Sequence, residues 1–119
     1  RENETHRILW KSSMTIGFKD YADWVEGKII TSPEERLQEH FYGLIEELGE
    51  VSSILKRHIR DGTPIDKDKL TLELGDSFFY LIATCNALDI SLVNVIERNI
   101  EKLNSRQARN KIKGSGDNR

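Results

Sequence analysis

Apolar residues recur every three or four positions along most of the chain, which is the period of an amphipathic α-helix. Four stretches show this period, and they cover residues 18–26, 33–60, 66–88 and 91–106. The two-residue alternation of a half-buried strand is not found. The pattern therefore predicts an all-α protein.

Local signals mark the ends of these helices. Ser32, Pro33 and Glu35 form a capping box with proline in the first turn, which predicts that the second helix begins at Pro33. Segment 61–64 contains glycine and proline and should end it. The later helices begin at residues that commonly cap helices, namely Asp66 or Asp68 for the third and Ser91 for the fourth.

The apolar side of each helix is expected to face a shared core. The expected inward residues are Leu37, Phe41, Leu44, Leu48, Val51, Leu55, Leu70, Leu74, Phe78, Leu81, Ile82, Cys85, Leu92, Val95, Ile96, Ile100 and Leu103. Further apolar residues lie off these stripes, and they include Ile45, Ile59, Leu72 and Phe79. One chain cannot cover all of this surface. We therefore expect a four-helix-bundle-type fold that is assembled as an obligate homo-oligomer.

Composition adds limits to this picture. The length fits a single domain over residues 1–119, with segments 1–12 and 107–119 expected to be flexible. The 18 basic and 20 acidic side chains leave a net charge of −2, which gives no support for nucleic-acid binding. We expect neither a membrane span nor a signal peptide, because no apolar run is long enough to span a bilayer. The single cysteine, Cys85, should be a small buried residue in a reducing cytoplasm.

Two pairs of carboxylates interrupt the most apolar parts of the chain. Glu47 and Glu50 are three residues apart on the second helix, and Glu73 and Asp76 are three apart on the third. Residues with this spacing share one side of a helix. If the two helices pack antiparallel through connection 61–65, the four carboxylates can converge.

Converging carboxylates repel one another, and a bound cation removes that cost. Carboxylate oxygens without histidine or thiolate favour Mg²⁺ or Mn²⁺ over zinc. Both pairs also have the form E-L-G-[E/D], with Gly49 and Gly75 inside helices. Glycine there costs about 1 kcal/mol relative to alanine, which indicates that another group approaches closely. The ordinary alternative is a pair of solvated acidic helix faces.

The combined motifs resemble the MazG-like, all-α nucleoside triphosphate pyrophosphohydrolases. The resemblance covers nearly the whole chain and is carried by FKDYADW, GLIEELGEV, ELGDSFFYL, NIEKLNSR and GSGDNR. It implies Mg²⁺-dependent hydrolysis of a (deoxy)nucleoside triphosphate to the monophosphate and pyrophosphate, as nucleotide-pool house-cleaning. Mn²⁺ is a possible substitute for Mg²⁺. It also implies intertwined homodimers, with pairing of dimers into tetramers as an option. The implied metal ligands are Glu47, Glu50, Glu73 and Asp76.

Further residues are candidates for catalysis or substrate binding. Glu46, beside the implied ligand Glu47, is a candidate for activating the attacking water, with an exposed helix residue as the alternative. Tyr80 lies one turn beyond Asp76 and could contact sugar or phosphate, or simply pack. Trp24, with its neighbours Tyr21 and Phe18, could stack on a base or belong to the core.

The fourth helix and the tail supply polar and basic candidates for binding phosphate. Asn99, Lys102 and Arg106 form a polar stripe suited to phosphate oxygens, or to the carboxylates opposite, or to structural pairing. The basic, glycine-containing tail could close over the triphosphate, from its own or a neighbouring subunit; a disordered terminus is the alternative.

Two other classes of protein were weighed against the enzyme. A dinuclear iron bundle needs Glu-x-x-His pairs, and the sequence has none. A non-catalytic helical interaction or regulatory module remains the alternative, although it would not need four intact carboxylates.

Overall fold

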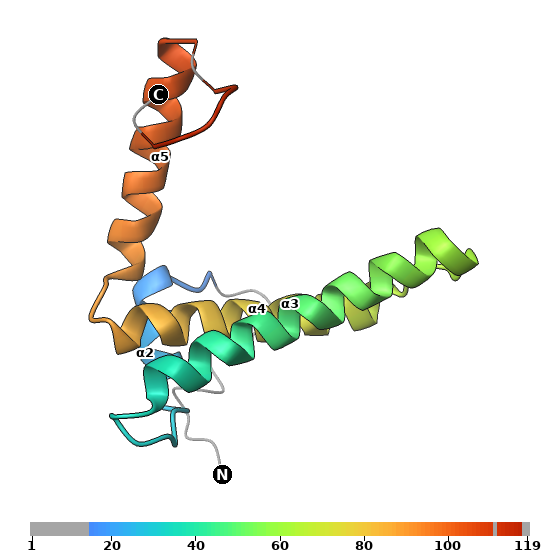
Figure 1. The fold of residues 1–119 in the computed structure, drawn as a ribbon. Helices are drawn as coiled ribbons and strands as arrows, with labels where there is room; N and C mark the ends of the chain where they lie inside the picture. The colour runs from blue at the N-terminus through green and yellow to red at the C-terminus, as the bar shows by residue number, and fades with distance from the viewer. Residues whose placement is uncertain (1–14, 111, 118–119) are drawn as a thin grey trace.

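A computed structural model describes residues 15–110 and 112–117 of the chain. Within these residues the protein has four helices and no strands, so the all-α prediction is confirmed (Figure 1). The helices are α2 (Phe18–Glu26), α3 (Arg36–Asp61), α4 (Lys67–Ala87) and α5 (Leu92–Ala108). The segment 1–12 that was expected to be flexible lies outside the described residues, as do the last two residues of the tail.

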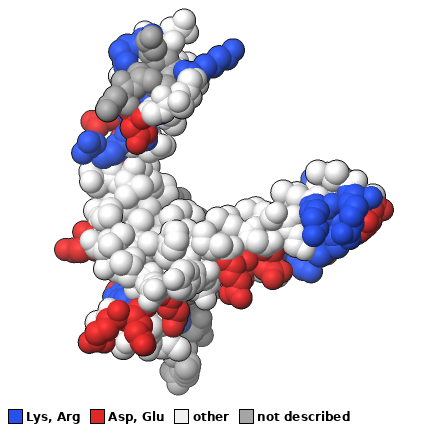
Figure 2. All heavy atoms as spheres, in the orientation of Figure 1, with Lys and Arg blue, Asp and Glu red and all other residues white. Residues whose placement is uncertain are grey.

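Helices α3 and α4 lie side by side as a long antiparallel hairpin (Figure 1). The turn between them begins at Gly62, whose φ of 71° lies in the left-handed region that glycine adopts without strain. Asp66 then caps α4, because its carboxylate accepts a hydrogen bond of 3.1 Å from the Lys69 amide. Of the two residues expected to begin this helix, Asp66 is the one that does. Basic side chains gather at the tip of the hairpin and acidic ones along its middle (Figure 2).

Helix α5 turns sharply away from the hairpin. Ser91 caps it as predicted, with its hydroxyl accepting a 3.3 Å hydrogen bond from the Asn94 amide. The axes of α4 and α5 are bent by 103° at the intervening break, so most of α5 projects from the rest of the molecule (Figure 1). No single described helix has both the length and the hydropathy to cross a membrane; only α4 and α5, taken together across their bend, meet that test.

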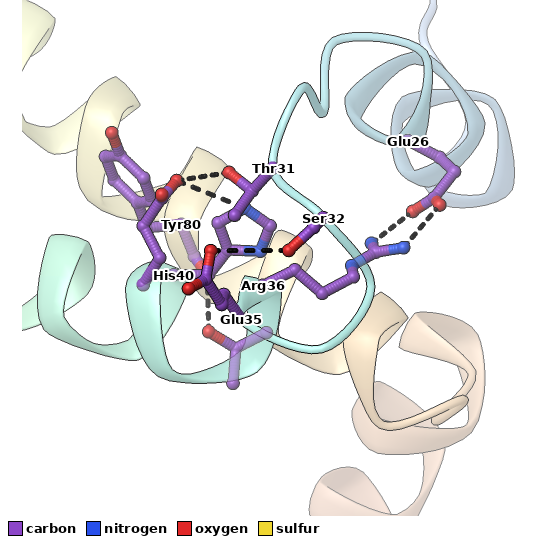
Figure 3. A network of polar contacts seen from close by, with 9 residues as sticks. Glu26, Thr31, Ser32, Glu35, Arg36, His40 and Tyr80 are labelled. Atoms are coloured by element: carbon purple, nitrogen blue, oxygen red, sulfur yellow. Dashed lines mark hydrogen bonds and ion pairs between the residues drawn. The ribbon is translucent and has the colours of Figure 1, made fainter.

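The start of α3 differs from its prediction by three residues. Residues 33–35 form a turn, and the amides of Glu35 and Arg36 both donate to the Ser32 carbonyl at 3.1 Å. The Ser32 hydroxyl donates to the Glu35 carboxylate at 3.3 Å, so the two side chains bind each other instead of the backbone amides of a capping box. Arg36 then begins the helix and binds both oxygens of Glu26 at 2.7 and 2.8 Å, which joins α3 to α2 (Figure 3).

The core of the described chain is small and lies where α2, α4 and α5 meet. It is formed by Val25, Ile82, Ala83 and Leu92, with partly buried side chains around them. Most of the residues expected to face inward are instead exposed, as shown by Phe41 (48% exposed) on α3 and Leu74 (50%) on α4. A single chain therefore leaves much of the predicted apolar stripe uncovered, because α5 does not fold back over the hairpin. Burial of this stripe in an oligomer stays a prediction.

Two further expectations about burial need correction. Phe79 was expected to lie off the apolar stripe, but it is half-buried and packs against the core. Cys85, expected to be buried, is half-buried as a free thiol, and burial raises its pKa.

Candidate metal centre

Three of the predicted carboxylates converge between α3 and α4. Glu73 and Asp76 lie on one side of α4, and the antiparallel hairpin brings Glu47 of α3 opposite them. One carboxylate oxygen from each residue lies within 4.8 Å of the other two. Glu47 and Glu73 are half-buried, whereas Asp76 is exposed. The structure therefore brings together three of the four carboxylates that the sequence spacing predicted to converge.

The cluster carries negative charge that no described basic side chain balances. Among the ion pairs of the described residues, none joins an arginine or lysine to Glu47, Glu73 or Asp76. The pKa of Glu47 is raised to about 7, first by desolvation, then by a hydrogen bond with Glu73 and by the neighbouring negative charges. Without a cation, this cluster favours keeping a proton. A donor set of oxygens alone fits Mg²⁺ or Mn²⁺.

The other residues of the two motifs lie outside the cluster. Glu50, one turn further along α3, is exposed and does not belong to the three-carboxylate group. Glu46 is exposed, and its charge contributes to the raised pKa of Glu47. Nothing lies within 4 Å of a Cβ built at Gly49 or Gly75. Within the described residues nothing approaches these glycines closely, so approach of a metal, a substrate or a second chain stays a prediction.

Tyr80 is half-buried and lines a recess beside the cluster. The pKa of its hydroxyl is raised by desolvation and then by the charges of Glu47, Glu39, Glu46 and Asp76, so the hydroxyl lies in their field. The recess has a volume of about 610 Å³. Its lining residues are Glu35, Gln38, Glu39, Tyr42, Gly43, Glu46 and Tyr80.

This recess was not predicted from the sequence, although a signal for it was present. Apart from Tyr80, its lining residues recur once per helical turn from Glu35, the residue before α3, to Glu46, and most are polar. They form a continuous polar helix face next to the apolar stripe.

The predicted aromatic residues lie where α2 packs on α4. The Trp24 ring is stacked on Tyr21 with 5.7 Å between centroids and meets the Phe79 ring edge-on at 6.1 Å. In the single chain Trp24 therefore packs against other aromatic side chains, which is the alternative to stacking on a base. Tyr21 also packs on Phe78 at 5.3 Å. Burial and the charge of Asp76 raise the pKa of Tyr21, so the Tyr21 hydroxyl lies in the field of Asp76. A contact between Trp24 and a base stays a prediction.

The polar and basic candidates on α5 do not lie near the carboxylate cluster. Asn99, Lys102 and Arg106 lie on the projecting helix, whose contact with the core is through its first turns (Figure 1). Lys102 and Arg106 bind the Asp117 carboxylate of the tail at 3.2 and 3.3 Å, and Arg106 also donates to the Gly116 carbonyl at 3.1 Å. Arg106 is only 4% exposed. The described part of the tail is therefore held against α5.

Comparisons with known proteins identify the class of this helical protein. Residues 36–109, which contain the three converging carboxylates and all of α5, match the MazG nucleotide pyrophosphohydrolase domain. The chain belongs to this family, and membership suggests nucleotide pyrophosphohydrolase activity. It is also similar to the Gene 37 protein of Mycobacterium phage L5, with 43% identity over 81 residues that cover 65% of this chain and 71% of the phage protein. No solved structure matches the chain.

Proposed function

We propose that this protein hydrolyses (deoxy)nucleoside triphosphates to nucleoside monophosphates and pyrophosphate, with Mg²⁺ as cofactor and nucleotide-pool house-cleaning as its role. The observation that carries the proposal is the convergence of Glu47, Glu73 and Asp76 within 4.8 Å. Such a cluster is costly unless it binds a cation. Family membership supplies the nucleotide as the natural partner of that cation.

In this proposal, Glu47, Glu73 and Asp76 hold the metal, and Glu50 joins them from the next turn of α3. Bound Mg²⁺, or Mn²⁺ in its place, would neutralise charge on the triphosphate. Glu46 accepts the proton of the attacking water, because it is an exposed carboxylate next to Glu47. Phosphoryl chemistry of this kind needs little more from the protein than positioning and charge.

The recess beside the cluster is suited to the nucleoside part of the substrate. Glu46 and Tyr80 belong to its wall, and the charges of Glu47 and Asp76 contribute to the raised pKa of Tyr80, which supports a recess that lies next to the metal centre. Gln38 and Tyr42 supply an amide and a hydroxyl, which are joined by a 3.2 Å hydrogen bond. These groups can bind sugar hydroxyls or base edges.

The functional form is proposed to be a homodimer or a dimer of dimers. Large apolar side chains on the hairpin remain uncovered, with Ile59 83% exposed and Leu72 70% exposed. The hairpin also carries opposite charges at its middle and its tip, so two antiparallel copies would be complementary (Figure 2). In such an assembly the projecting α5 can bring Lys102 and Arg106 to the triphosphate bound by another subunit.

Screening the eight common (d)NTPs tests the proposal. Each nucleotide is incubated with protein and Mg²⁺, and inorganic phosphate is measured with and without added pyrophosphatase. We expect phosphate only when pyrophosphatase is present, and none when EDTA replaces Mg²⁺. Phosphate that appears without pyrophosphatase would indicate a phosphatase. Absence of turnover with all eight nucleotides would overturn the proposal in favour of a non-catalytic module.

A further inference from the structure

One glycine of α3 lies directly against an aromatic ring of α4. A Cβ built at Gly43 would be 2.6 Å from Cε1 of Tyr80, 2.7 Å from Cδ1 and 2.9 Å from Cζ. Distances below 3.0 Å are not found for real Cβ atoms, so the ring occupies the space that any other side chain at position 43 would need. The ring therefore packs on the bare backbone of α3.

Two other rings contact the Tyr80 ring. The centroids of the His40 and Tyr80 rings lie 6.3 Å apart (Figure 3). The Phe79 ring meets the Tyr80 ring edge-on at 5.5 Å. The backbone of Tyr80 is also held, because the Thr84 hydroxyl donates to the Tyr80 carbonyl at 2.8 Å. His40 is itself buried, so on that side the ring packs against the protein interior.

We propose that Gly43 is a positioning residue, whose missing side chain provides the seat that places Tyr80 between the carboxylate cluster and the recess. The packing of the Tyr80 ring on Gly43 is inferred from the interatomic distances alone. Its consequence for nucleotide hydrolysis rests on the proposed function, in which Tyr80 contacts the substrate.

The displacement caused by a methyl group can be derived from the same distances. With alanine at position 43, Cε1 of Tyr80 must move from 2.6 Å to at least 3.4 Å from the new Cβ atom to reach ordinary contact. This is a shift of about 0.8 Å. The hydroxyl at the end of the ring moves with it. A misplacement of this order can lower a rate by up to about a hundredfold.

A double-mutant cycle tests the seat without any substrate. The melting temperature is measured for wild type, Gly43→Ala, Tyr80→Ala and the double variant. Gly43→Ala should lower it by several degrees in the wild-type background. In the Tyr80→Ala background the same change should leave it unaltered or raise it, because alanine favours the helix once the ring is gone.

Gly49→Ala is the matched control, since this helical glycine also lies on α3 and no atom lies within 4 Å of its Cβ position. Its effect on the melting temperature should be the same with and without the Tyr80 ring. If Gly43→Ala shows no dependence on Tyr80, the seat does not exist. If Gly43→Ala fails to fold but the double variant folds, the ring is the cause and the seat is confirmed. Failure of both to fold would overturn the proposal.

Kinetics separate positioning from packing alone. With the best triphosphate, Gly43→Ala and Tyr80→Ala should lower kcat/KM by similar factors, with the same division between kcat and KM, and the double variant should lose no more than either. If the factors by which the two single variants lower kcat/KM multiply in the double variant, Gly43 acts independently of Tyr80. That result would overturn the positioning role. If wild type hydrolyses no nucleotide, the proposed function fails, whereas the melting cycle still decides the seat.

Discussion

Replacing Asp76 by asparagine removes one negative charge from the cluster and keeps the size of the side chain. The carboxylate oxygens of Glu47, Glu73 and Asp76 lie within 4.8 Å of one another. At a pH above about 7, where Glu47 has lost its proton, two full charges at that distance repel by about 1 kcal/mol in water and by about 3.5 kcal/mol at a protein-like dielectric. Because Asp76 is exposed, the lower value applies after screening. Metal-free Asp76→Asn should therefore melt about 5 °C above wild type.

The same variant should be poor at catalysis. We expect kcat to fall by at least about a hundredfold, which corresponds to about 2.7 kcal/mol of transition-state stabilisation. Mg²⁺ should raise the melting temperature of wild type, because it binds the folded state, and should raise that of the variant less. The measurements are turnover of triphosphate to monophosphate and pyrophosphate, and thermal unfolding with Mg²⁺ or with EDTA.

Two matched variants sharpen this comparison. Glu50→Gln should gain less stability without metal, because Glu50 lies outside the three-carboxylate group, yet it should lose activity if Glu50 joins the metal. Glu34→Gln, at an exposed position before α3, should change neither property. Full activity of Asp76→Asn would refute the metal-ligand assignment. A lower melting temperature with an unchanged Mg²⁺ response would show that Asp76 serves a structural contact instead.

Three other perturbations follow from the described contacts. The hydrogen bonds from Arg36 lower the pKa of Glu26, so their stabilisation is present above the unfolded-state pKa and is lost as the pH falls through the lower folded-state pKa. Glu26→Gln should therefore lower the melting temperature at neutral pH, and this effect should disappear progressively in acid. Asp117→Asn removes the ion pairs of the tail with Lys102 and Arg106, although Arg106 keeps its hydrogen bond to the Gly116 carbonyl, so KM for nucleotide should fall several-fold; an unchanged KM would leave both residues a purely structural role. Leu72→Asp should dissociate the oligomer in light scattering, and a 13.7 kDa wild-type particle at micromolar concentration would contradict assembly.

Helix positions were predictable because their signals are local. A capping residue acts on the amides two or three positions ahead, and Asp66 and Ser91 do this in the structure as expected. The start of α3 was predicted wrongly because its determinants are not local. Arg36 is held by Glu26 from another helix, and Ser32 and Glu35 bind each other in a turn that a linear pattern cannot distinguish from a capping box.

The same distinction applies to the candidate site. Because Glu73 and Asp76 are three residues apart on a helix, their side chains share one side of it. The short connection of the hairpin then brings Glu47 opposite them. The sequence could not reveal that α5 leaves the hairpin at a bend of 103°. That angle depends on packing at the α4–α5 junction, and it determines whether Lys102 and Arg106 serve the cluster of their own chain or that of another subunit.

Glycine gives the clearest case of what a sequence pattern omits. Gly49 and Gly75 attract attention because they repeat within the acidic pairs, yet no described residue outside their own helix backbone approaches either of them. Gly43 begins the segment GLIEELGEV but lies outside the acidic pairs, and its role depends on a tyrosine of another helix. Since a methyl group at Gly49 or Gly75 has free space among the described residues, a cost of alanine there would point to metal, substrate or a second chain. Measuring that cost in the assembled protein, with and without Mg²⁺ and nucleotide, would therefore separate these three sources.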